Sequence, residues 1–352
     1  MNRITAPLRQ TSFTLEQTAQ TILDIQLPSG EIPWHIGGKT DPWDHVEAAM
    51  GLCVAGYLTE ARKAYLWLAE NQLADGSWYA AYRNGVPEDR TREANHAAYI
   101  AVGLLQYLLI TRDIGFVKKL WPTLRSALDF VVGLQAPGGE IHWAISPEDR
   151  VDPMALLTGS CSIYQSLKCG LFIAHRLGYA LHRWEKAMLN LENAIRTKPH
   201  HFNMTKSRFS MDWFYPILCG ALTGYDAQQR IHRHWKKFVV EGQGVKCVSD
   251  QPWVTIAESA EFCLALHAMG NHRLSEIVFN WIVEKRDDDG GYWCGYTYPD
   301  MTIWPEERMS WTNGVVLMAA DAVYGLTPAA RLFDHGWWND RLPCEKTIAP
   351  MH

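Results

Sequence analysis

Apolar residues recur at intervals of three and four positions through most of the chain, and this spacing is typical of amphipathic helices. The strict alternation of apolar and polar residues that marks a half-buried strand is nearly absent. The pattern predicts twelve helices that alternate between a more charged set and a more apolar set. The charged set covers residues 14–26, 58–72, 113–135, 181–196, 226–240 and 271–286. The apolar set covers residues 42–56, 92–111, 159–177, 211–223, 252–268 and 306–325.

The connections between these helices alternate in length. Short turns follow the apolar helices, and four of them carry a glycine: Gly56, Gly178, Gly224 and Gly270. Long loops follow the charged helices and cover residues 27–41, 73–91, 136–158, 197–210, 241–251 and 287–305. Six helical hairpins of this kind close into a ring, so we expect an all-α (α/α)6 toroid with every long loop at one end. We expect residues 1–325 to form a single toroid domain and residues 326–352 to trail from it, packed through Trp337 and Trp338.

The apolar helices are expected to form the inner ring. Segments such as 47–52 and 97–103 are rich in alanine and glycine, and small residues let crowded helices approach one another. The other set carries charges, for example at 60–63 and 230–237, as the solvated face of an outer layer does.

A glycine–tryptophan repeat marks four of the long loops. Its copies are residues 26–34, 72–78, 135–143 and 286–293, and the first and third share the pattern Q-x-x-x-G-E-I-x-W. Repeats indicate supersecondary units that bury their apolar faces only by stacking on one another. Glycine permits the left-handed conformation that ends a helix, and the tryptophan can cover the next inner helix. We therefore assign the Gln and Trp residues of the repeat mainly to the scaffold.

Composition narrows the possible functions. A net charge of −5 without a basic stripe gives no reason to expect nucleic acid as a partner. The N-terminus lacks an apolar signal region, and no apolar run approaches membrane-spanning length. The eight cysteines are scattered without a C-x-x-C pair, so we expect reduced thiols in a cytoplasmic protein with no transmembrane segment. Sixteen tryptophans suggest an aromatic wall or cleft as well as a core.

Gln72, Gly76 and Trp78 match the Q-x-x-x-G-x-W repeat of the squalene-cyclase and protein-prenyltransferase toroids, and the chain resembles that superfamily. It also resembles bacterial proteins described as prenyltransferase-like, through residues 40–50, 75–78, 210–213, 252–255 and 304–308. The resemblance implies the α/α toroid, but two signatures of the superfamily's chemistry are missing. Residues 287–289 lack the Asp-x-Asp-Asp spacing of terpene cyclases, and no Asp-x-Cys with a following His provides the prenyltransferase zinc site. The same ring of hairpins is similar to that of the six-hairpin glycosidases.

In such a ring the long loops open onto the N-termini of the inner helices, and the side chains there are the candidates for chemistry. At least five of the six inner helices begin near a carboxylate, and opposed carboxylates suit a general acid and base, which inverting glycosidases space by roughly 6.5–9.5 Å. We expect Asp44 and Glu258 to be this pair, with Glu93, Asp212 and Glu307 as further catalytic candidates. Because opposite helices face each other, Asp44 should face Asp212, and Glu93 should face Glu258.

Aromatic and polar residues at the same helix starts are expected to bind the substrate. Flat aromatic faces suit the apolar faces of sugar rings, and they would equally stabilise a carbocation. The candidates are Trp43, His45, Glu47, His96, Tyr99, Tyr164, Trp213, Asp250, Trp253, Trp304 and Trp311.

Substrate charge and metal binding can also be judged from the sequence. Seven cations lie in or beside the long loops: Arg83, Arg90, Arg92, Arg150, Lys206, Arg208 and Lys246. They could bind an anionic group of the substrate. Ordinary pairing with nearby carboxylates explains them equally well. The histidine pairs at 200–201 and 232/234 have no cysteine or carboxylate at ligand spacing, so we expect no metal and no cofactor.

Three functions remain open from the sequence. The first is a metal-independent enzyme that acts on a glycosidic bond of an oligosaccharide or glycoconjugate by carboxylate acid/base catalysis. The second is a terpenoid cyclase or prenyltransferase-like enzyme with an isoprenoid substrate in an aromatic cavity. The third is a non-catalytic binding protein. A polar cavity with opposed acids favours the first, a deep apolar cavity the second, and a filled cavity the third.

Overall fold

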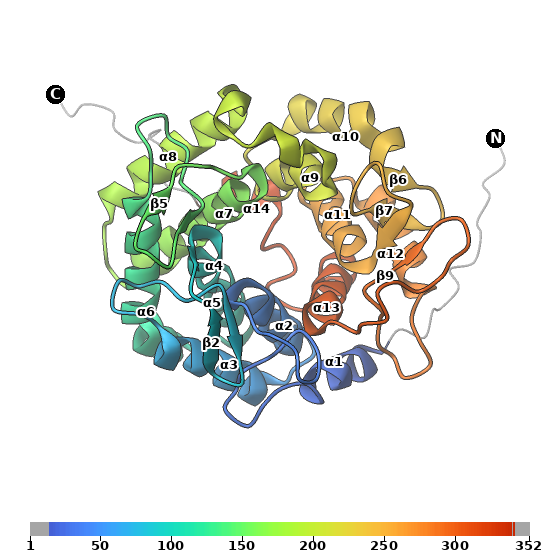
Figure 1. Cartoon of the computed structure of the whole chain (residues 1–352), viewed down its shortest axis with the longest axis horizontal. Coiled ribbons are helices and arrows are strands. Elements are labelled where there is room, and N and C mark those ends of the chain that lie inside the picture. Colours follow the sequence, from blue (N-terminus) through green and yellow to red (C-terminus); the bar gives the residue numbers. More distant parts are fainter. Residues whose placement is uncertain (1–13, 340, 342–352) are drawn as a thin grey trace.

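The computed structural model describes residues 14–339 and 341, which form a ring of helical hairpins (Figure 1). The inner helices are α2 (Pro42–Val54), α4 (Ala94–Ala98) continued by α5 (Ile100–Thr111), α7 (Leu157–Arg176), α9 (Ser210–Leu218), α11 (Ile256–Ala268) and α13 (Ser310–Tyr324). The outer helices are α1 (Leu15–Leu23), α3 (Leu58–Asn71), α6 (Ile114–Gly133), α8 (His182–Thr197), α10 (Gly224–Phe238) and α12 (His272–Val283). The predicted all-α toroid is confirmed, with the inner and outer sets that the sequence indicated.

Small residues close the inner ring where its first and last helices meet. A Cβ atom added to Gly51 of α2 would lie 2.5 Å from Gly314 Cα of α13. One added to Gly314 would lie 2.5 Å from the backbone oxygen of Glu47. Real side chains do not approach so closely, so the two helices can cross at this distance only because both positions are glycine.

The glycine–tryptophan repeat joins four pairs of neighbouring outer helices. In three copies the glutamine amide donates one hydrogen bond to the carbonyl of its own turn glycine and another to a carbonyl of the following outer helix. These bonds run from Gln26 to Gly30 and Glu60, from Gln72 to Gly76 and Thr123, and from Gln135 to Gly139 and Ala187, at 2.8–3.1 Å. Each glycine lies so close to the next outer helix that a Cβ would collide with its backbone. The glutamines and glycines therefore belong to the scaffold.

The fourth copy closes the outer ring. It carries Arg286 in place of the glutamine, and its turn glycine, Gly290, packs against Gln17 of α1. Thr18 of α1 supplies the missing donor, with its Oγ1 2.8 Å from Gly290 O. The last hairpin is thus joined to the first outer helix by the same kind of contact.

Short antiparallel strands lie in the long loops, at the end of the ring that faces the viewer in Figure 1. They are β1 (Ala81–Arg83) with β2 (Val86–Asp89); β3 (Arg92–Glu93), β4 (Ala144–Ile145) and β5 (Val151–Asp152); and β6 (Val239–Val240), β7 (Gly244–Lys246), β8 (Trp253–Thr255) and β9 (Gly295–Thr297). Two short 3-10 turns, Pro199–His201 and Met204–Arg208, precede α9. The expectation of almost no strands was wrong for these loops, because strands of two to four residues are too short to show alternation.

Two inner helices begin later than the sequence pattern predicts. The fifth was expected from residue 252 and begins at Ile256, and the sixth was expected from residue 306 and begins at Ser310. In the fifth, residues 253–255 pair with both β7 and β9, so strand pairing takes the backbone bonds that a helix would use. As a result, Trp253 lies on a strand and Glu307 on a loop, and each precedes its inner helix.

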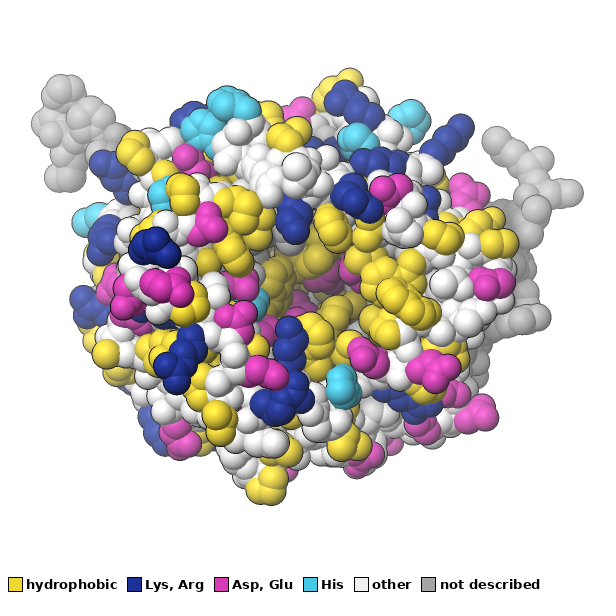
Figure 2. Space-filling view, in the orientation of Figure 1, with side chains coloured by type: hydrophobic (Ala, Val, Ile, Leu, Met, Phe, Trp, Pro, Cys, Tyr) yellow, Lys and Arg dark blue, Asp and Glu magenta, His cyan; other side chains and the backbone are white. Residues whose placement is uncertain are grey.

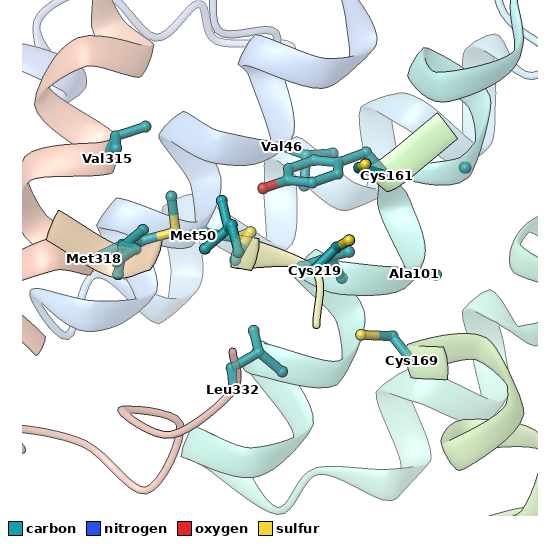
Figure 3. Packing of buried hydrophobic residues seen from close by; sticks show 14 of the residues in the cluster. Val46, Met50, Ala101, Cys161, Cys169, Cys219, Val315, Met318 and Leu332 are labelled. Atoms are coloured by element: carbon teal, nitrogen blue, oxygen red, sulfur yellow. The ribbon is translucent and has the colours of Figure 1, made fainter. Parts of the chain in front are cut away.

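The lower interior of the ring is filled with apolar side chains. Met50 from α2, Met318 from α13 and Leu332 from the C-terminal segment point toward one another there (Figure 3). Leu332 is followed by α14 (His335–Asn339), in which Trp337 and Trp338 are both buried. Residues 342–352 of the expected trailing segment lie outside the described residues. The apolar side chains of these described residues thus fill space at the end of the ring away from the long loops.

One stretch corrects the expectation about apolar length. Residues Ala94–Thr111, which form α4 and α5, are long and apolar enough to cross a membrane by length and composition. However, 72% of this stretch is buried inside the ring, where α2, α6 and α7 contact it. Its apolar character is accounted for by its place in the inner wall.

Replacing Gly76 by alanine should lower the free energy of unfolding by about 3 kcal/mol or more, because the methyl group needs a left-handed backbone and also collides with Ser126 of α6. Gly56 is a matched control: its φ of +86° is close to the +93° of Gly76, but nothing lies within 4 Å of an added Cβ. Gly56→Ala should cost only about 1–2 kcal/mol in denaturant unfolding. Equal losses of stability in the two variants would contradict a close contact between Gly76 and α6.

Candidate functional site

The first turn of α2 builds one wall of the site. Pro42 suits the first helical position, and Asp41 caps the helix by accepting a hydrogen bond from Asp44 N (2.9 Å). The other oxygen of Asp41 accepts from Trp34 Nε1 (2.6 Å). Capping therefore orients Asp41 toward the mouth of the ring, with Asp44 one turn further on.

A polar cleft of about 530 Å³ opens at this mouth. Figure 2 shows the same face hollowed at its centre, with acidic and apolar side chains in the hollow. The lining combines two inner-helix starts with the β1–β2 hairpin, and its residues are Trp34, Lys39, Asp41, Asp44, Ala80, Ala81, Arg83, Glu88, Asp89, Glu93 and His96. Of the expected catalytic residues, Asp44 and Glu93 lie together here.

Below the cleft, carboxylates stand one helical turn apart on two inner helices. Asp44 is followed by Glu47 on α2, and Glu258 is followed by Glu261 on α11. Glu47, Glu258 and Glu261 are 2%, 7% and 3% exposed, so the inner wall of the ring holds a group of buried acids. In Figure 1, α2 and α11 lie on different sides of the central space.

Aromatic side chains hold the deeper carboxylates. Trp43 Nε1 donates to Glu47 Oε1 (2.9 Å), and the hydroxyl of Tyr215 donates to Glu261 Oε1. The Trp43 ring lies 5.5 Å from that of Tyr99 and 5.9 Å from that of Tyr215. Trp43 and Tyr99 thus lie within this acidic group, as the sequence predicted.

The carboxylates of this group perturb one another. Burial, followed by the negative charges of Asp41 and Glu47, raises the pKa of Asp44 well above its usual range. Burial raises the pKa of Glu47 to about 8. Burial and the charge of Glu47 also raise the pKa of Glu261. Burial without a cationic partner favours the protonated form of a carboxyl group, and Glu47, with a pKa of about 8, is mostly protonated at neutral pH.

Glu258 and Asp44 approach the same part of the ring from different helices. Burial, followed by the charges of Glu258, Glu307 and Asp44, raises the pKa of Cys294 to about 12. Burial and the adjacent Glu258 carboxylate also raise the pKa of Cys247. The influence of Asp44, Glu258 and Glu307 on one thiol places the three expected catalytic residues around a common region.

His96 lies between two carboxylates of the cleft. Its Nε2 is 3.5 Å from Glu93 Oε2 and 3.9 Å from Asp41 Oδ1. The His96 ring also stands edge-on to Trp43, with centroids 6.4 Å apart. His96 therefore connects Glu93 to the α2 carboxylates. The sequence pairing of Glu93 with Glu258 is not reproduced among these contacts.

Asp212 does not face Asp44, contrary to the expectation. Its carboxylate accepts bonds from Thr158 N (3.2 Å) and Thr158 Oγ1 (2.6 Å), so it caps the start of α7. It lines a separate cavity of about 340 Å³ between α9 and α10. The charges that act on Asp44 come from α2 and from Glu261 of α11 instead.

Several expected binding residues are committed to the scaffold. His45 is fully buried, its Nδ1 accepts from Ile32 N and its Nε2 donates to Ala64 O (both 3.0 Å), and burial lowers its pKa to about 4. Trp213 donates to Arg230 O and stacks on Phe238. Tyr164 is buried beside Lys168, and Asp250 is an exposed partner of Arg208. Trp311 is half-buried in the first turn of α13.

Sequence reasoning missed other residues of the cleft. Trp34 was assigned to the scaffold and Asp41 to capping, yet both line the cleft. The β1–β2 hairpin contributes Arg83, Glu88 and Asp89, and the Asn-Gly pair at 84–85 was the turn signal that could have revealed it.

The loop cations mostly have local partners. Arg83 pairs with Glu88 and donates to Gly37 O, Arg92 pairs with Asp75 and Asp149, and Arg150 lies 3.9 Å from Glu148. Ordinary pairing with carboxylates therefore accounts for Arg83, Arg92 and Arg150. Among the described residues, no group of three or more His, Cys, Asp or Glu side chains is arranged to hold a metal ion.

Comparison with known proteins bears on both the fold and the activity. The chain is 48% identical over 317 residues to the MMP endo-(1,4)-3-O-methyl-alpha-D-mannosidase of Mycolicibacterium hassiacum, covering 90% of this chain and 88% of that protein. No protein-family model matches the chain.

Solved structures with little sequence similarity share the fold. They include a GH63 mannosylglycerate hydrolase from Thermus thermophilus in complex with glucose (12% identity, TM-score 0.68, 86% of this chain and 99% of that one). A glycosidase variant in complex with glucose has 15% identity and a TM-score of 0.66 over 89% of this chain and 96% of that one. A D-mannose isomerase has 10% identity and a TM-score of 0.67 over 92% and 99%.

These comparisons support the six-hairpin glycosidase architecture and a carbohydrate substrate, and they do not support the prenyltransferase-like assignment. The polar, acid-lined cleft agrees with this outcome, since an isoprenoid would need a deep apolar cavity. The chain belongs to the family of the Mycolicibacterium hassiacum MMP endo-(1,4)-3-O-methyl-alpha-D-mannosidase, and it is a glycoside hydrolase.

Proposed function

We propose that this chain is an endo-acting α-mannosidase that hydrolyses (1→4) bonds between 3-O-methyl-D-mannose units. The substrate follows from the name of the relative that is 48% identical over nearly the whole chain. The observation that carries the proposal is a polar cleft lined by the half-buried Asp44, whose pKa is raised by burial and by neighbouring acids that include Glu261 of α11. Glycosidic bond cleavage uses two carboxyl groups in different roles, one of which protonates the departing oxygen.

Asp44 is the general acid of the proposed reaction. A general acid must hold its proton at the working pH and release it to the departing sugar oxygen. Burial, with Asp41 and Glu47 as acidic neighbours, raises the pKa of the Asp44 carboxyl and so favours its protonated form. Asp44 also lines the cleft, so its proton lies where a substrate can accept it.

Glu258 supplies the second carboxyl group that hydrolysis requires. It stands in the first turn of α11 and is 7% exposed. The influence of both Glu258 and Asp44 on Cys294 supports their assignment as a pair. Glu93, beside His96, and Glu307, beside Cys294, remain secondary candidates at the edge of this region.

Glu47 and Glu261 lie one helical turn beyond Asp44 and Glu258, deeper in the ring. Trp43 and Tyr215 donate to them, so each carboxyl is fixed in position. The half-buried ring of Trp43 provides a flat surface for the sugar at the cleavage point, and the buried Tyr99 ring backs it. Several acids share this buried region, so a further negative charge there is unfavourable, and this raises the pKa of Asp44.

Replacing Asp44 by asparagine or Glu258 by glutamine should lower kcat on a (1→4)-linked 3-O-methyl-α-mannan oligosaccharide by about 10²–10⁴-fold, because proton transfer is lost while the shape is kept. Asp226→Asn, an exposed carboxylate on the outer helix α10, is the control and should leave kcat unchanged. Turnover is measured by reducing-sugar release. A normal kcat in both the Asp44 and the Glu258 variant would contradict their assignment as the catalytic pair.

The stability of the protein should fall as the pH rises from about 4.5 to about 8. The Glu47 carboxyl binds its proton up to about pH 8 in the folded protein, whereas the unfolded chain releases it near 4.5. Unfolding therefore releases a proton in this window, and a higher pH favours unfolding. In Glu47→Gln, Tm should decline less between these pH values than in the wild type. Glu70→Gln, exposed on α3, is the control; an identical decline in all three proteins would contradict the raised pKa.

Hydrolysis should survive chelation, since the proposed mechanism uses side chains alone. Dialysis against EDTA should change kcat/KM by less than about twofold, measured with the same oligosaccharide before and after Mg²⁺, Ca²⁺ or Zn²⁺ is restored. A loss of activity that one of these ions reverses would show that a metal takes part.

A further inference from the structure

The loop-side face of the ring carries an exposed apolar patch near the start of α11, at the rim of the central hollow. This rim patch consists of Trp253, Tyr298, Ile303 and Trp304, and the last three are 44%, 39% and 55% exposed. Apolar side chains border the central hollow over the region of β9 in Figure 2. Clustered exposed apolar groups at a functional face indicate a binding surface. The polar chemistry described above uses none of these four side chains.

The two indoles of the rim patch are fixed in position. Trp253 Nε1 donates to Trp304 O (2.7 Å), and the rings stand edge to face with centroids 5.0 Å apart. Trp304 N donates to Gly295 O of β9 (3.0 Å), and Trp253 pairs with Thr297 across the β8–β9 ladder. The polar atom of Trp253 is thus used internally, whereas the indole of Trp304, which meets the Trp253 ring, remains 55% exposed.

The rim patch lies close to the proposed catalytic carboxyl but not next to it. Strand β8 runs directly into α11, and Trp253 precedes Glu258 by five residues. At no more than about 3.6 Å per residue, their Cα atoms are at most about 18 Å apart, a span of a few sugar rings. The rim patch is therefore within reach of a substrate chain that is cleaved at Glu258.

We propose that the rim patch is a distal subsite that binds a 3-O-methylated mannose ring beyond the cleavage point. The proposal rests on the proposed function. A 3-O-methyl group replaces a hydroxyl donor by an apolar group, which enlarges the apolar surface that a sugar presents to an indole face. An endo-acting enzyme needs such contacts, because its substrate continues on both sides of the bond that is cleaved.

The test is a size-graded series of (1→4)-linked 3-O-methyl-α-D-mannose oligosaccharides, from the shortest that is cleaved upward. Trp304→Ala should lower kcat/KM for the long members by about 10- to 100-fold and leave the shortest unchanged, because only the long members reach the rim. Trp304→Phe, which keeps a flat ring, should recover most of the loss. Tyr225→Ala is the matched control: Tyr225 is 72% exposed at the start of α10, at the opposite end of the ring, and its loss should affect no member.

A parallel measurement separates this proposal from the proposed function. Binding of the longest methylated member and of its unmethylated counterpart to Asp44→Asn is measured by calorimetry, with and without Trp304→Ala. Tighter binding of the methylated chain that is lost in the double variant supports the distal subsite. If Trp304→Ala affects all lengths equally, or none, or if methylation makes no difference, the subsite is refuted while the hydrolase stands. Absence of both cleavage and binding by the otherwise intact protein would overturn the substrate itself and the subsite with it.

Discussion

The contact between a turn glycine and the backbone of the next outer helix sets the geometry of the whole ring. At Gly30, Gly76 and Gly139 the chain comes closer to its neighbour than any side chain would allow, and a glutamine amide ties the two together. At Gly290 the same approach joins the last hairpin to α1. These four contacts fix neighbouring hairpins against one another on both sides of the point where the inner ring closes, at Gly51 and Gly314.

Closure has a direct consequence for chemistry. It turns the starts of the inner helices toward one space, so that carboxylates from different parts of the chain become neighbours. Asp44 and Glu47 come from one inner helix and Glu258 and Glu261 from another, and burial raises the pKa values of Asp44, Glu47 and Glu261. Such a group opposes folding at neutral pH, because unpaired carboxyls are costly to bury. The packed lower interior around Met50 and Leu332 and the interlocked outer ring offset this cost.

The same arrangement separates roles that look alike in the sequence. Asp44 and Asp212 both stand in the first turn of an inner helix, yet Asp44 opens to the cleft whereas Asp212 caps α7 beside Thr158. Likewise His45 and His96 both lie near helix starts, but His45 faces the outer layer and His96 faces Glu93. Which way each side chain points depends on the rotation of its helix in the ring, and on whether a loop strand such as β3 or β8 precedes it.

The sequence alone determined the fold class, the alternation of inner and outer helices and the end of the ring at which the site would lie. Those features follow from local periodicity and turn residues, whose physical causes act within a few positions along the chain. It also marked Asp44, Glu258, Trp43 and Tyr99, because carboxylates and aromatic residues inside apolar helices are locally conspicuous. Only the tertiary structure decided that Asp212 and His45 turn away, that Trp34 and the β1–β2 hairpin join the cleft, and that Glu261 acts on Asp44. These outcomes depend on contacts between residues far apart in sequence, and no local pattern records the distance at which two helices finally pack.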